Sequence, residues 1–302
     1  MRKLLYRLRG QWHMRWKPEG FEADLSADEP GVIWQGIKYP AQRWDELRDA
    51  HPGAAILCAA GPSLGMLQGF TERQAAGDWI AGVNGAIRLR DRELVNFDLF
   101  MMTDSNMVTL QWDNLVEAFE TSKRVIISPK VAAGICQRDP TVLARAPFWL
   151  VRQPHEPYGR RRASKRQMRK RETAGEMVVG EQQWRFSGFS RNPDFGFFAG
   201  GTVAVAAIQA LAFAGCTRIA IAGMDLSGGQ HFYQEARVKQ SRLSGDYETR
   251  IEPALRSASV AACMDGIELL NLSPQSRLPE EIIPKVGPAT VGLKAAKDSA
   301  AS

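Results

Sequence analysis

The chain reads Ile56-Leu57-Cys58-Ala59-Ala60-Gly61-Pro62-Ser63-Leu64, in which an apolar strand runs into a turn and then a predicted helix. Gly61 lets the backbone turn sharply and leaves room for a ligand, and Pro62 suits the first helical position. Ser63 adds a hydroxyl beside backbone N–H groups, and such groups bind phosphate at helix starts. We interpret this stretch as a nucleotide-binding loop, with an ordinary strand-to-helix turn as the alternative. It matches neither the GxGxxG fingerprint nor a Walker A loop.

Short apolar runs of strand length recur along the chain, and several are followed by turn residues and helical patterns. The runs are residues 54–59, 79–83, 98–102, 124–127, 148–151, 218–222 and 267–270. This alternation predicts an α/β fold over residues 51–288. We expect a Rossmann-like, mainly parallel sheet with helices on both faces.

The composition fits one folded domain with a sizeable core. The 302 residues are 44% hydrophobic and carry a formal net charge of +6, which suggests an anionic partner. The four cysteines are far apart, so the spacing of a disulfide framework or a zinc site is missing. No apolar run approaches the roughly 20 residues of a spanning helix, and no signal-peptide core follows the basic start. We therefore expect a cytoplasmic protein.

A second motif lies later in the chain, where Gly200-Gly201-Thr202 precedes an Ala-rich run over residues 203–214. A helix that is apolar all round is expected to be buried, and its start offers a second anion site made of backbone N–H groups. The next strand leads into Asp225. An Asp at a strand exit is well placed for a sugar hydroxyl, a proton or a metal, with capping of a turn as the alternative.

Polar residues also end other predicted strands, and we expect them to line one crevice and bind the nucleotide. They are Asn84, Asp104, Asn271 and Ser273. His231 follows Asp225 by six positions across a Gly-Gly turn, which lets it fold back over the strand ends. We predict His231 as the catalytic base, with Asp225 orienting the imidazole or the acceptor. A structural histidine is the alternative.

Residues 1–50 are predicted to form a basic N-terminal segment and lead-in. Residues 1–17 carry six cations and no acidic residue, and Leu4, Leu8, Trp12 and Trp16 recur every four residues. On a helix these four would form one apolar stripe, which is typical of a helix on an anionic membrane surface. We therefore expect peripheral contact with the inner membrane surface, with a helix packed on the domain as the alternative. Residues 289–302 are predicted to be a disordered tail.

Residues 155–192 interrupt the strand–helix alternation with a dense basic block. The cations that we predict to bind phosphate or the acceptor are Arg160, Arg161, Arg162, Lys165 and Arg166. The block would act as a lid or as an arm that orders on its ligand. A solvated loop is the alternative, because like charges repel one another. The block lacks interleaved aromatic residues, so nucleic acid is not an expected partner.

Taken in order, these motifs form a set. Gly61-Pro62-Ser63 follows the first strand, Asn84 and Asp104 follow the next two, and then come the Gly-Gly-Thr helix start, Asp225 and the run Asn-Leu-Ser-Pro-Gln-Ser at 271–276. The set resembles the superfamily of bacterial CMP-sialic acid transferases and hydroxymethylpterin diphosphokinase-like proteins. Over about residues 50–285, it is most similar to the lipopolysaccharide core enzymes that transfer Kdo from CMP-Kdo.

The resemblance implies a Rossmann-like fold and, by position, contacts of CMP with Gly61, Ser63, Asn84, Gly201 and Thr202. It also implies inverting transfer without a metal or another cofactor. The expected function is the transfer of an acidic sugar, of the Kdo or sialic acid type, from a CMP donor. The acceptor would be a lipopolysaccharide core or a similar phosphorylated glycolipid.

Two features depart from the pattern of the resemblance. Relatives often carry Gly-Asn where this chain has Ala59-Ala60, and sialyltransferases carry tyrosines where phenylalanines stand at 195, 197 and 198. The alternative function is a nucleotide-dependent diphosphokinase that acts on a small molecule. It would need Mg²⁺, which we would place on Asp104 and Asp225.

Overall fold

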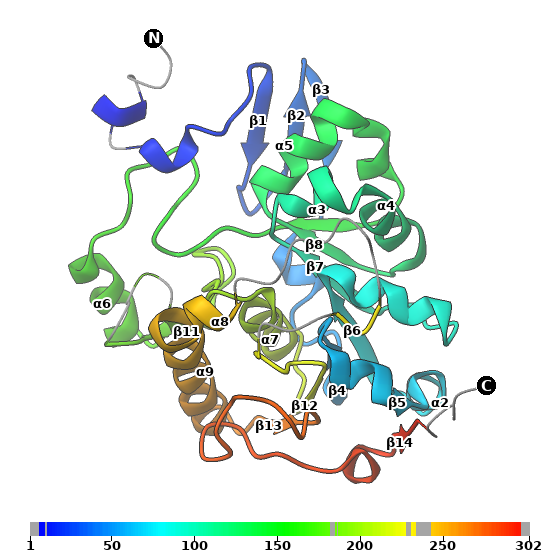
Figure 1. The fold of residues 1–302 in the computed structure, drawn as a ribbon. Coiled ribbons are helices and arrows are strands. Elements are labelled where there is room, and N and C mark those ends of the chain that lie inside the picture. The colour runs from blue at the N-terminus through cyan, green and yellow to red at the C-terminus, as the bar shows by residue number, and fades with distance from the viewer. Residues whose placement is uncertain are drawn as a thin grey trace.

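The computed structural model describes residues 6–9, 11–181, 185, 187–227, 231–233 and 243–296. A parallel sheet of seven strands, in the order β13-β12-β4-β6-β7-β8-β9, forms its centre (Figure 1). The strands are β4 (Ala54–Cys58), β6 (Trp79–Val83), β7 (Leu99–Met102), β8 (Val125–Ile127), β9 (Phe148–Leu150), β12 (Arg218–Ala222) and β13 (Glu268–Asn271). All seven predicted runs are strands of this sheet, so the α/β prediction is confirmed.

The strand order reverses once. The chain runs from β4 outward through β6, β7, β8 and β9, and then returns to place β12 and β13 on the other side of β4. In open α/β sheets of this kind, ligands bind outside the carboxyl ends of the strands, where the order reverses. The loops that follow β4 and β12 therefore lie at the expected binding position.

Helices cover both faces of the sheet, which explains why the strands are continuous apolar runs. Alternate strand residues such as Ile56 and Phe100 point into one core, and Leu57 and Met101 point into the other. The first face packs against α2 (Phe70–Ala75), α3 (Asn106–Leu110), α4 (Trp112–Thr121) and α5 (Pro129–Arg138). The second packs against α7 (Val203–Phe213) and α9 (Glu252–Met264).

Helix α7 is the buried helix that the Ala-rich run predicts. Thr202 caps its start, since the Thr202 hydroxyl accepts a hydrogen bond from the Ala204 N–H at 3.4 Å. Gly215 follows its end with φ of 91°, a conformation that favours glycine. The helix lies against β4, β6 and β7, beneath the middle of the sheet.

Short helical turns connect these elements. They are η2 (Trp44–Glu46), η3 (Pro62–Met66), η4 (Asn84–Asp91), η5 (Pro140–Ala144), α8 (Leu243–Asp246) and η6 (Tyr247–Ile251). The helix predicted after Gly61 is thus only the 3-10 turn η3. The predicted disordered tail also differs from the structure, because η7 (Pro288–Val291) and β14 (Lys294–Ala295) are ordered and β14 pairs with β5 (Leu67–Gln68). Residues 297–302 lie outside the described residues.

The N-terminal part contains an antiparallel sheet that the sequence analysis does not predict. Its strands are β1 (Phe21–Asp24), β2 (Gly31–Trp34) and β3 (Ile37–Pro40), and β1 and β2 lie against α5. The single striped helix over residues 1–17 is not formed by the described residues. Residues 6–8 form one helical turn, and η1 (Trp12–Met14) forms a separate one. Leu4 lies outside the described residues.

The reason for this break is packing. The ring of Trp16 lies 6.1 Å from that of Phe21 and 6.5 Å from that of Tyr158, while Leu8 is 70% exposed. Leu8 and Trp16 therefore do not share one face. The N-terminal segment instead lies against the start of the basic insertion, where Gln11 Nε2 donates to the Gly159 carbonyl at 2.6 Å.

The basic insertion is ordered where it is described. It contains α6 (Lys165–Thr173), β10 (Met177–Val179) and β11 (Gly188–Ser190), and residues 182–184 and 186 lie outside the described residues. Ser164 and Gln167 form a capping box at the start of α6. Met168 anchors the helix in a small apolar cluster with Met177 and Phe198. The part of the block on α6 is thus a packed helix with charged faces, while Arg160, Arg161 and Arg162 precede it as exposed residues outside any helix or strand.

Candidate functional site

The loop after β4 is joined to the loop after β12. The Gly61 N–H donates to the Gly223 carbonyl at 2.8 Å, and the Ser63 N–H donates to Asp225 Oδ2 at 3.0 Å. A Cβ atom at position 61 would overlap the Asp225 carboxylate and the Gly223 carbonyl. Gly61 is therefore required by close approach, since its φ of −73° suits any residue. These two loops form one rigid edge at the reversal of strand order.

A buried hydrogen-bond network supports this edge from the side of β13. The Ser63 hydroxyl donates to Ser273 Oγ at 2.8 Å, and Ser273 Oγ accepts from the Met224 N–H at 3.0 Å. Asn271 Oδ1 accepts from the Ser273 N–H at 3.0 Å. Asn271 and Ser273 are fully buried. They shape the loops, and their predicted contact with the nucleotide stays a prediction.

The turn after β6 presents a buried acceptor to the same edge. Asn84 has a φ of 48°, a left-handed conformation that asparagine tolerates better than most residues. Its Oδ1 atom is buried and has no hydrogen-bond partner among the described residues. An unsatisfied buried acceptor is rare in proteins and requires an explanation. Because β6 is the neighbour of β4, this acceptor lies one strand away from the Gly61 loop.

Residues 231–233, which we call the strap, contact the loop after β4 and the turn after β6. His231 Nδ1 lies 3.3 Å from the Ala60 carbonyl, and the Phe232 N–H donates to the same oxygen at 3.2 Å. A carbonyl oxygen only accepts, so this contact assigns the proton of the neutral imidazole to Nδ1 and leaves Nε2 as the basic nitrogen. The ring of His231 stacks on that of Tyr233 at 5.2 Å.

Tyr233 is a contact that the sequence analysis misses. Its hydroxyl accepts from Gln111 Nε2 at 3.3 Å and lies against Gly85, where any Cβ atom would overlap it. The strap therefore spans from the Ala60 loop to the turn after β6. The flanking residues 228–230 and 234–242 lie outside the described residues. The one sequence signal for this contact is the small residue at position 85.

The remaining predicted nucleotide residues lie around this centre. Gly201 and Thr202 begin α7, and Gly201 approaches Arg250 and Ile251. Asp104 follows β7, is exposed, and accepts from the Asn106 N–H at 2.9 Å. The strand exits that carry candidates thus belong to β13, β12, β4, β6 and β7, which are neighbours in this order. That these side chains line one crevice and bind the nucleotide stays a prediction.

The diphosphokinase alternative would place Mg²⁺ on Asp104 and Asp225. These residues follow β7 and β12, which are separated by β4 and β6, so their strands are about 14 Å apart. Ligands of one Mg²⁺ lie about 2.1 Å from it, so the two carboxylates do not fit a shared ion. Among the described residues, no group of three or more His, Cys, Asp or Glu side chains is close enough to hold a metal.

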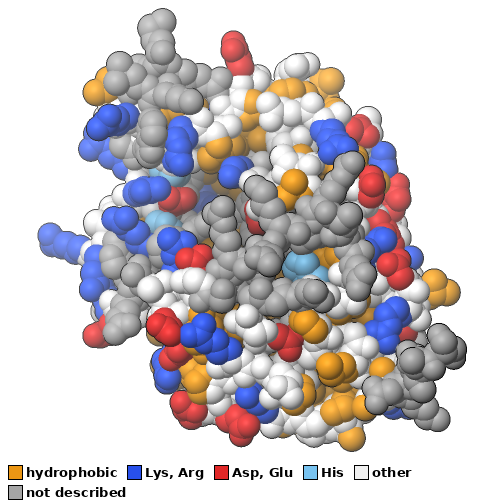
Figure 2. Space-filling view, in the orientation of Figure 1, with side chains coloured by type: hydrophobic (Ala, Val, Ile, Leu, Met, Phe, Trp, Pro, Cys, Tyr) orange, Lys and Arg blue, Asp and Glu red, His pale blue; other side chains and the backbone are white. Residues whose placement is uncertain are grey.

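Lys and Arg side chains gather on the side of the molecule that carries α6 and the N-terminal segment (Figure 2). Of the predicted phosphate-binding residues, Arg160, Arg161, Lys165 and Arg166 are exposed. Arg162 forms an ion pair with Glu156 at 2.5 Å. These residues do not belong to the edge formed by β4, β6 and β12. They form a separate basic surface.

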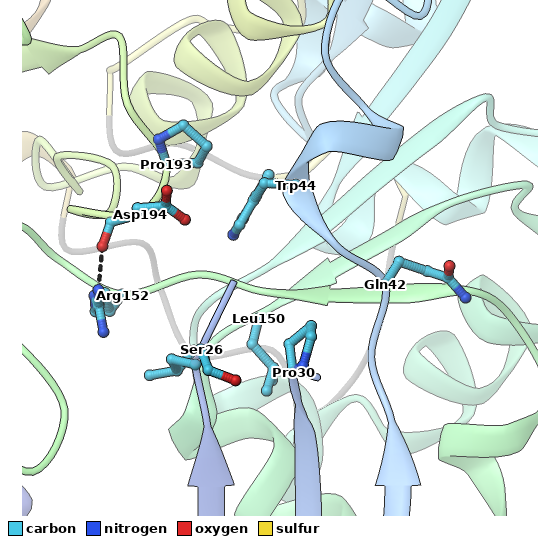
Figure 3. A pocket seen from close by; sticks show the side chains of 9 residues that line it. Ser26, Pro30, Gln42, Trp44, Leu150, Arg152, Pro193 and Asp194 are labelled. Carbon is cyan, nitrogen blue, oxygen red and sulfur yellow. Dashed lines mark hydrogen bonds between the residues drawn. The ribbon is translucent and has the colours of Figure 1, made fainter. Parts of the chain in front are cut away.

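A crevice lies between the N-terminal sheet and the central sheet (Figure 3). Trp44, Arg152 and Asp194 contribute to its lining, and the Arg152 guanidinium donates to the Asp194 backbone carbonyl. Arg152 follows β9 and therefore lies on the same carboxyl edge as the nucleotide loops. The sequence analysis does not single it out.

The sheet order and the strand-exit residues define an α/β protein of the Rossmann-like class. Residues 48–289 match the family model described as 3-deoxy-D-manno-octulosonic acid transferase WaaZ, and the chain belongs to this family. It is a Kdo transferase, a glycosyltransferase of lipopolysaccharide core synthesis. The resemblance to the lipopolysaccharide core enzymes that transfer Kdo is thereby confirmed.

Solved structures are similar to this chain at low identity. The chain is similar to the sialyltransferase CstII from Campylobacter jejuni in complex with a substrate analogue, cytidine-5'-monophosphate. The TM-score is 0.46, with 13% identity over 82% of this chain and 91% of that chain. It is also similar to the MAf glycosyltransferase from Magnetospirillum magneticum AMB-1, with a TM-score of 0.42 and 14% identity over 82% of this chain and 35% of that chain. No curated protein sequence matches significantly.

The described residues contain no helix that is long and apolar enough to cross a membrane.

Proposed function

We propose that the CMP moiety of the donor binds at the carboxyl edge formed by β12, β4 and β6. The observation that carries this proposal is the buried acceptor of Asn84, which has no partner among the described residues and lies one strand from the Gly61 loop. A hydroxyl or amino group of a nucleoside would satisfy this acceptor. The position at the reversal of strand order supports the same assignment. Gly201 and Thr202 would add backbone N–H groups at the start of α7.

The proposed reaction is a direct displacement that inverts the anomeric carbon. The acceptor oxygen forms a bond to that carbon as the bond to the CMP phosphate breaks. The hydroxyl proton passes to His231 Nε2, and the electron pair of the broken bond leaves with CMP. The contact between Nδ1 and the Ala60 carbonyl supports this role, since it orients the imidazole. A positioned base contributes about 10²–10⁴-fold.

Asp225 has a positioning role in this proposal. Its carboxylate is buried and holds the Ser63 N–H, so it orders the loop that binds the donor. A carboxylate that accepts from a backbone N–H makes one of the stronger hydrogen bonds in proteins. That Asp225 also orients the acceptor, as the sequence suggests, stays a prediction that the kinetics of an Asp225 variant would test.

The proposed acceptor is a phosphorylated glycolipid at the inner membrane surface. The basic surface around α6 and the exposed Leu8, with Arg7 and Arg9 beside it, supports peripheral binding to anionic lipid. Each cation near such a surface contributes about 1 kcal/mol. Removal of residues 1–17 should release the protein from anionic vesicles at low salt. Full-length protein that never co-sediments with such vesicles would contradict this part.

Thermal unfolding with added CMP tests the donor site. CMP at about 100 times its Kd should raise Tm by about 4 °C in the presence of EDTA. Gly61→Ala should abolish this shift, because its Cβ overlaps Asp225. Gly287→Ala is the matched control, since a Cβ there meets nothing within 4 Å. Stabilisation by ATP with Mg²⁺ and none by CMP would instead support the diphosphokinase.

A further inference from the structure

Two arginines contact adjacent residues of the loop that precedes α7. Arg152, which follows β9, donates to the backbone carbonyl of Asp194 (Figure 3). Arg171, on α6, lies over the ring of Phe195 with its guanidinium carbon 3.9 Å from the ring centroid. Since adjacent Cα atoms are about 3.8 Å apart, one short loop brings a strand-exit arginine and a helix arginine together.

Arg160 adds a third positive charge to this pair. Burial lowers the pKa of Arg152, and the charges of Arg160 and Arg171 lower it further, while Asp194 opposes them. Burial also lowers the pKa of Arg171, with Arg160 adding to the effect and Glu176 opposing it. The positive charge of Arg160 therefore acts on both Arg152 and Arg171, although the three groups come from three separate segments.

Among the described residues, Asp194 and Glu176 act on Arg152 and Arg171 without forming an ion pair with them. Among the described residues, no Asp or Glu oxygen lies within 4.0 Å of a side-chain nitrogen of Arg152, Arg160 or Arg171. Other cations of the block differ, since Arg162 pairs with Glu156 and Arg169 with Glu172, both at 2.5 Å. The Arg152 guanidinium has a neutral carbonyl as its partner. Two half-buried arginines and an exposed one, for which the described residues show no ion pair with a carboxylate, are suited to an anionic ligand.

Guanidinium groups bind phosphate with two parallel hydrogen bonds, and several of them together favour a doubly charged anion over a carboxylate. Arg152 leaves the same carboxyl edge as the Gly61 loop. Three strands (β6, β7 and β8) lie between β4 and β9, so the two positions are four strand spacings apart, about 19 Å. This separation of the two strand ends favours a phosphate other than that of a nucleotide bound at the Gly61 loop.

We propose that Arg152, Arg160 and Arg171 form a binding site for a phosphate monoester of the acceptor glycolipid. This inference rests on the proposed function, because it assumes that the acceptor hydroxyl reaches the donor site. The distance of about 19 Å along the sheet edge then makes the cluster a specificity determinant. It selects acceptors whose phosphate lies several sugar units from the hydroxyl that is attacked.

Binding of a core oligosaccharide tests the site without any need for transfer. The probe is lipopolysaccharide core oligosaccharide, before and after chemical removal of its phosphates, titrated into the full-length chain. Arg152→Gln, Arg160→Gln and Arg171→Gln should each raise the Kd for the phosphorylated probe by at least about tenfold. The dephosphorylated probe should bind more weakly to the wild type, and the three substitutions should not change its Kd.

Arg218→Gln is the control for net charge. Arg218 begins β12, so it lies at the amino ends of the strands, opposite the carboxyl edge that carries Arg152. It should leave both Kd values unchanged. Arg160 is exposed, so its replacement removes charge without loss of core packing. The CMP shift in Tm should persist in all four variants.

Three results would overturn the site. The first is equal affinity of the wild type for the phosphorylated and dephosphorylated probes. The second is a rise in Kd for the phosphorylated probe in Arg218→Gln as large as in the three arginine variants. The third is loss of CMP binding in those variants, which would assign the cluster to the donor phosphate. If the protein transfers no Kdo and yet binds the phosphorylated probe through these arginines, the proposed function fails and the phosphate site remains.

Discussion

The backbone N–H of Ser63 donates to the carboxylate of Asp225 at 3.0 Å, although the two residues are 162 positions apart in the chain. This bond joins the loops after β4 and β12 at the reversal of strand order. It lies beside the contact of the Gly61 N–H with the Gly223 carbonyl. The loop after β4 is therefore held in place by the loop after the neighbouring strand, β12.

Asp225→Asn should weaken this bond, because a neutral amide is a poorer acceptor than a carboxylate. We expect a loss of about 1 kcal/mol in the free energy of unfolding and a rise of about tenfold in the Kd for CMP. Denaturant unfolding and CMP titration measure these effects. If the Kd is unchanged and turnover instead falls by about 10²-fold or more, Asp225 belongs to the reacting groups.

Asn84→Gly should remove the buried acceptor and still allow the φ of 48°. We expect a rise of about tenfold in the Kd for CMP, because the donor group of the nucleoside would lose its partner. Gln35→Gly is the matched control, since Gln35 is exposed and has a φ of 49°. If Asn84→Gly binds CMP as the wild type does, the Asn84 acceptor does not face the nucleotide.

His231→Ala should lower turnover by about 10²-fold or more and leave the Kd for CMP unchanged, because the imidazole acts on the acceptor proton. Steady-state kinetics at saturating donor, together with CMP titration, separate these effects. Turnover at the wild-type rate would assign His231 to packing against Tyr233. The search for the base would then move to Asp246 or Tyr247, which follow the strap in the chain.

The junction of the N-terminal segment with the insertion should lose stability in acid. Burial lowers the pKa of His155 from 6.5 to about 4, with Arg162, Arg185 and His13 adding to the shift and Glu156 opposing it. Burial also lowers the pKa of His13, which lies 3.2 Å from the Pro157 carbonyl.

Between the folded-state and unfolded-state pKa values of His155, the unfolded chain binds the proton and the folded chain does not. The stabilisation by His155 is therefore complete above pH 6.5 and is lost as the pH falls toward 4. For His155 alone the loss amounts to about 3 kcal/mol. Urea unfolding at pH values from about 7.5 to about 4.5 measures it, and His155→Gln should flatten the dependence. The same slope in His155→Gln would show that other groups cause the pH effect.

The strands of the central sheet were predictable because they are buried on both faces. The predicted run at 79–83 coincides with β6, and the Ala-rich run begins α7 directly after its Thr202 cap. Such elements carry a local signal in the sequence. The short strand β3 does not, because its residues are mostly exposed and it ends in Pro40.

The site was predictable as a set of strand exits and not as a set of contacts. The position of Asn84 after a strand is a local feature, while the approach of Tyr233 to Gly85 depends on the path of a distant strap. The four-residue repeat of Leu8 and Trp16 was misleading because Trp16 packs on Phe21 and Tyr158. The arginine cluster combines a strand exit, a turn and a helix, so no single motif contains it.

Mass spectrometry of a transfer reaction tests the central claim most directly. The full-length protein is incubated with CMP-Kdo and lipopolysaccharide core acceptor in the presence of EDTA, and both products are quantified. We expect the acceptor to gain Kdo in amounts equal to the CMP released, and His231→Ala to reduce both together. An acceptor of unchanged mass, under conditions in which a known Kdo transferase modifies it, would show that the protein does not catalyse this transfer.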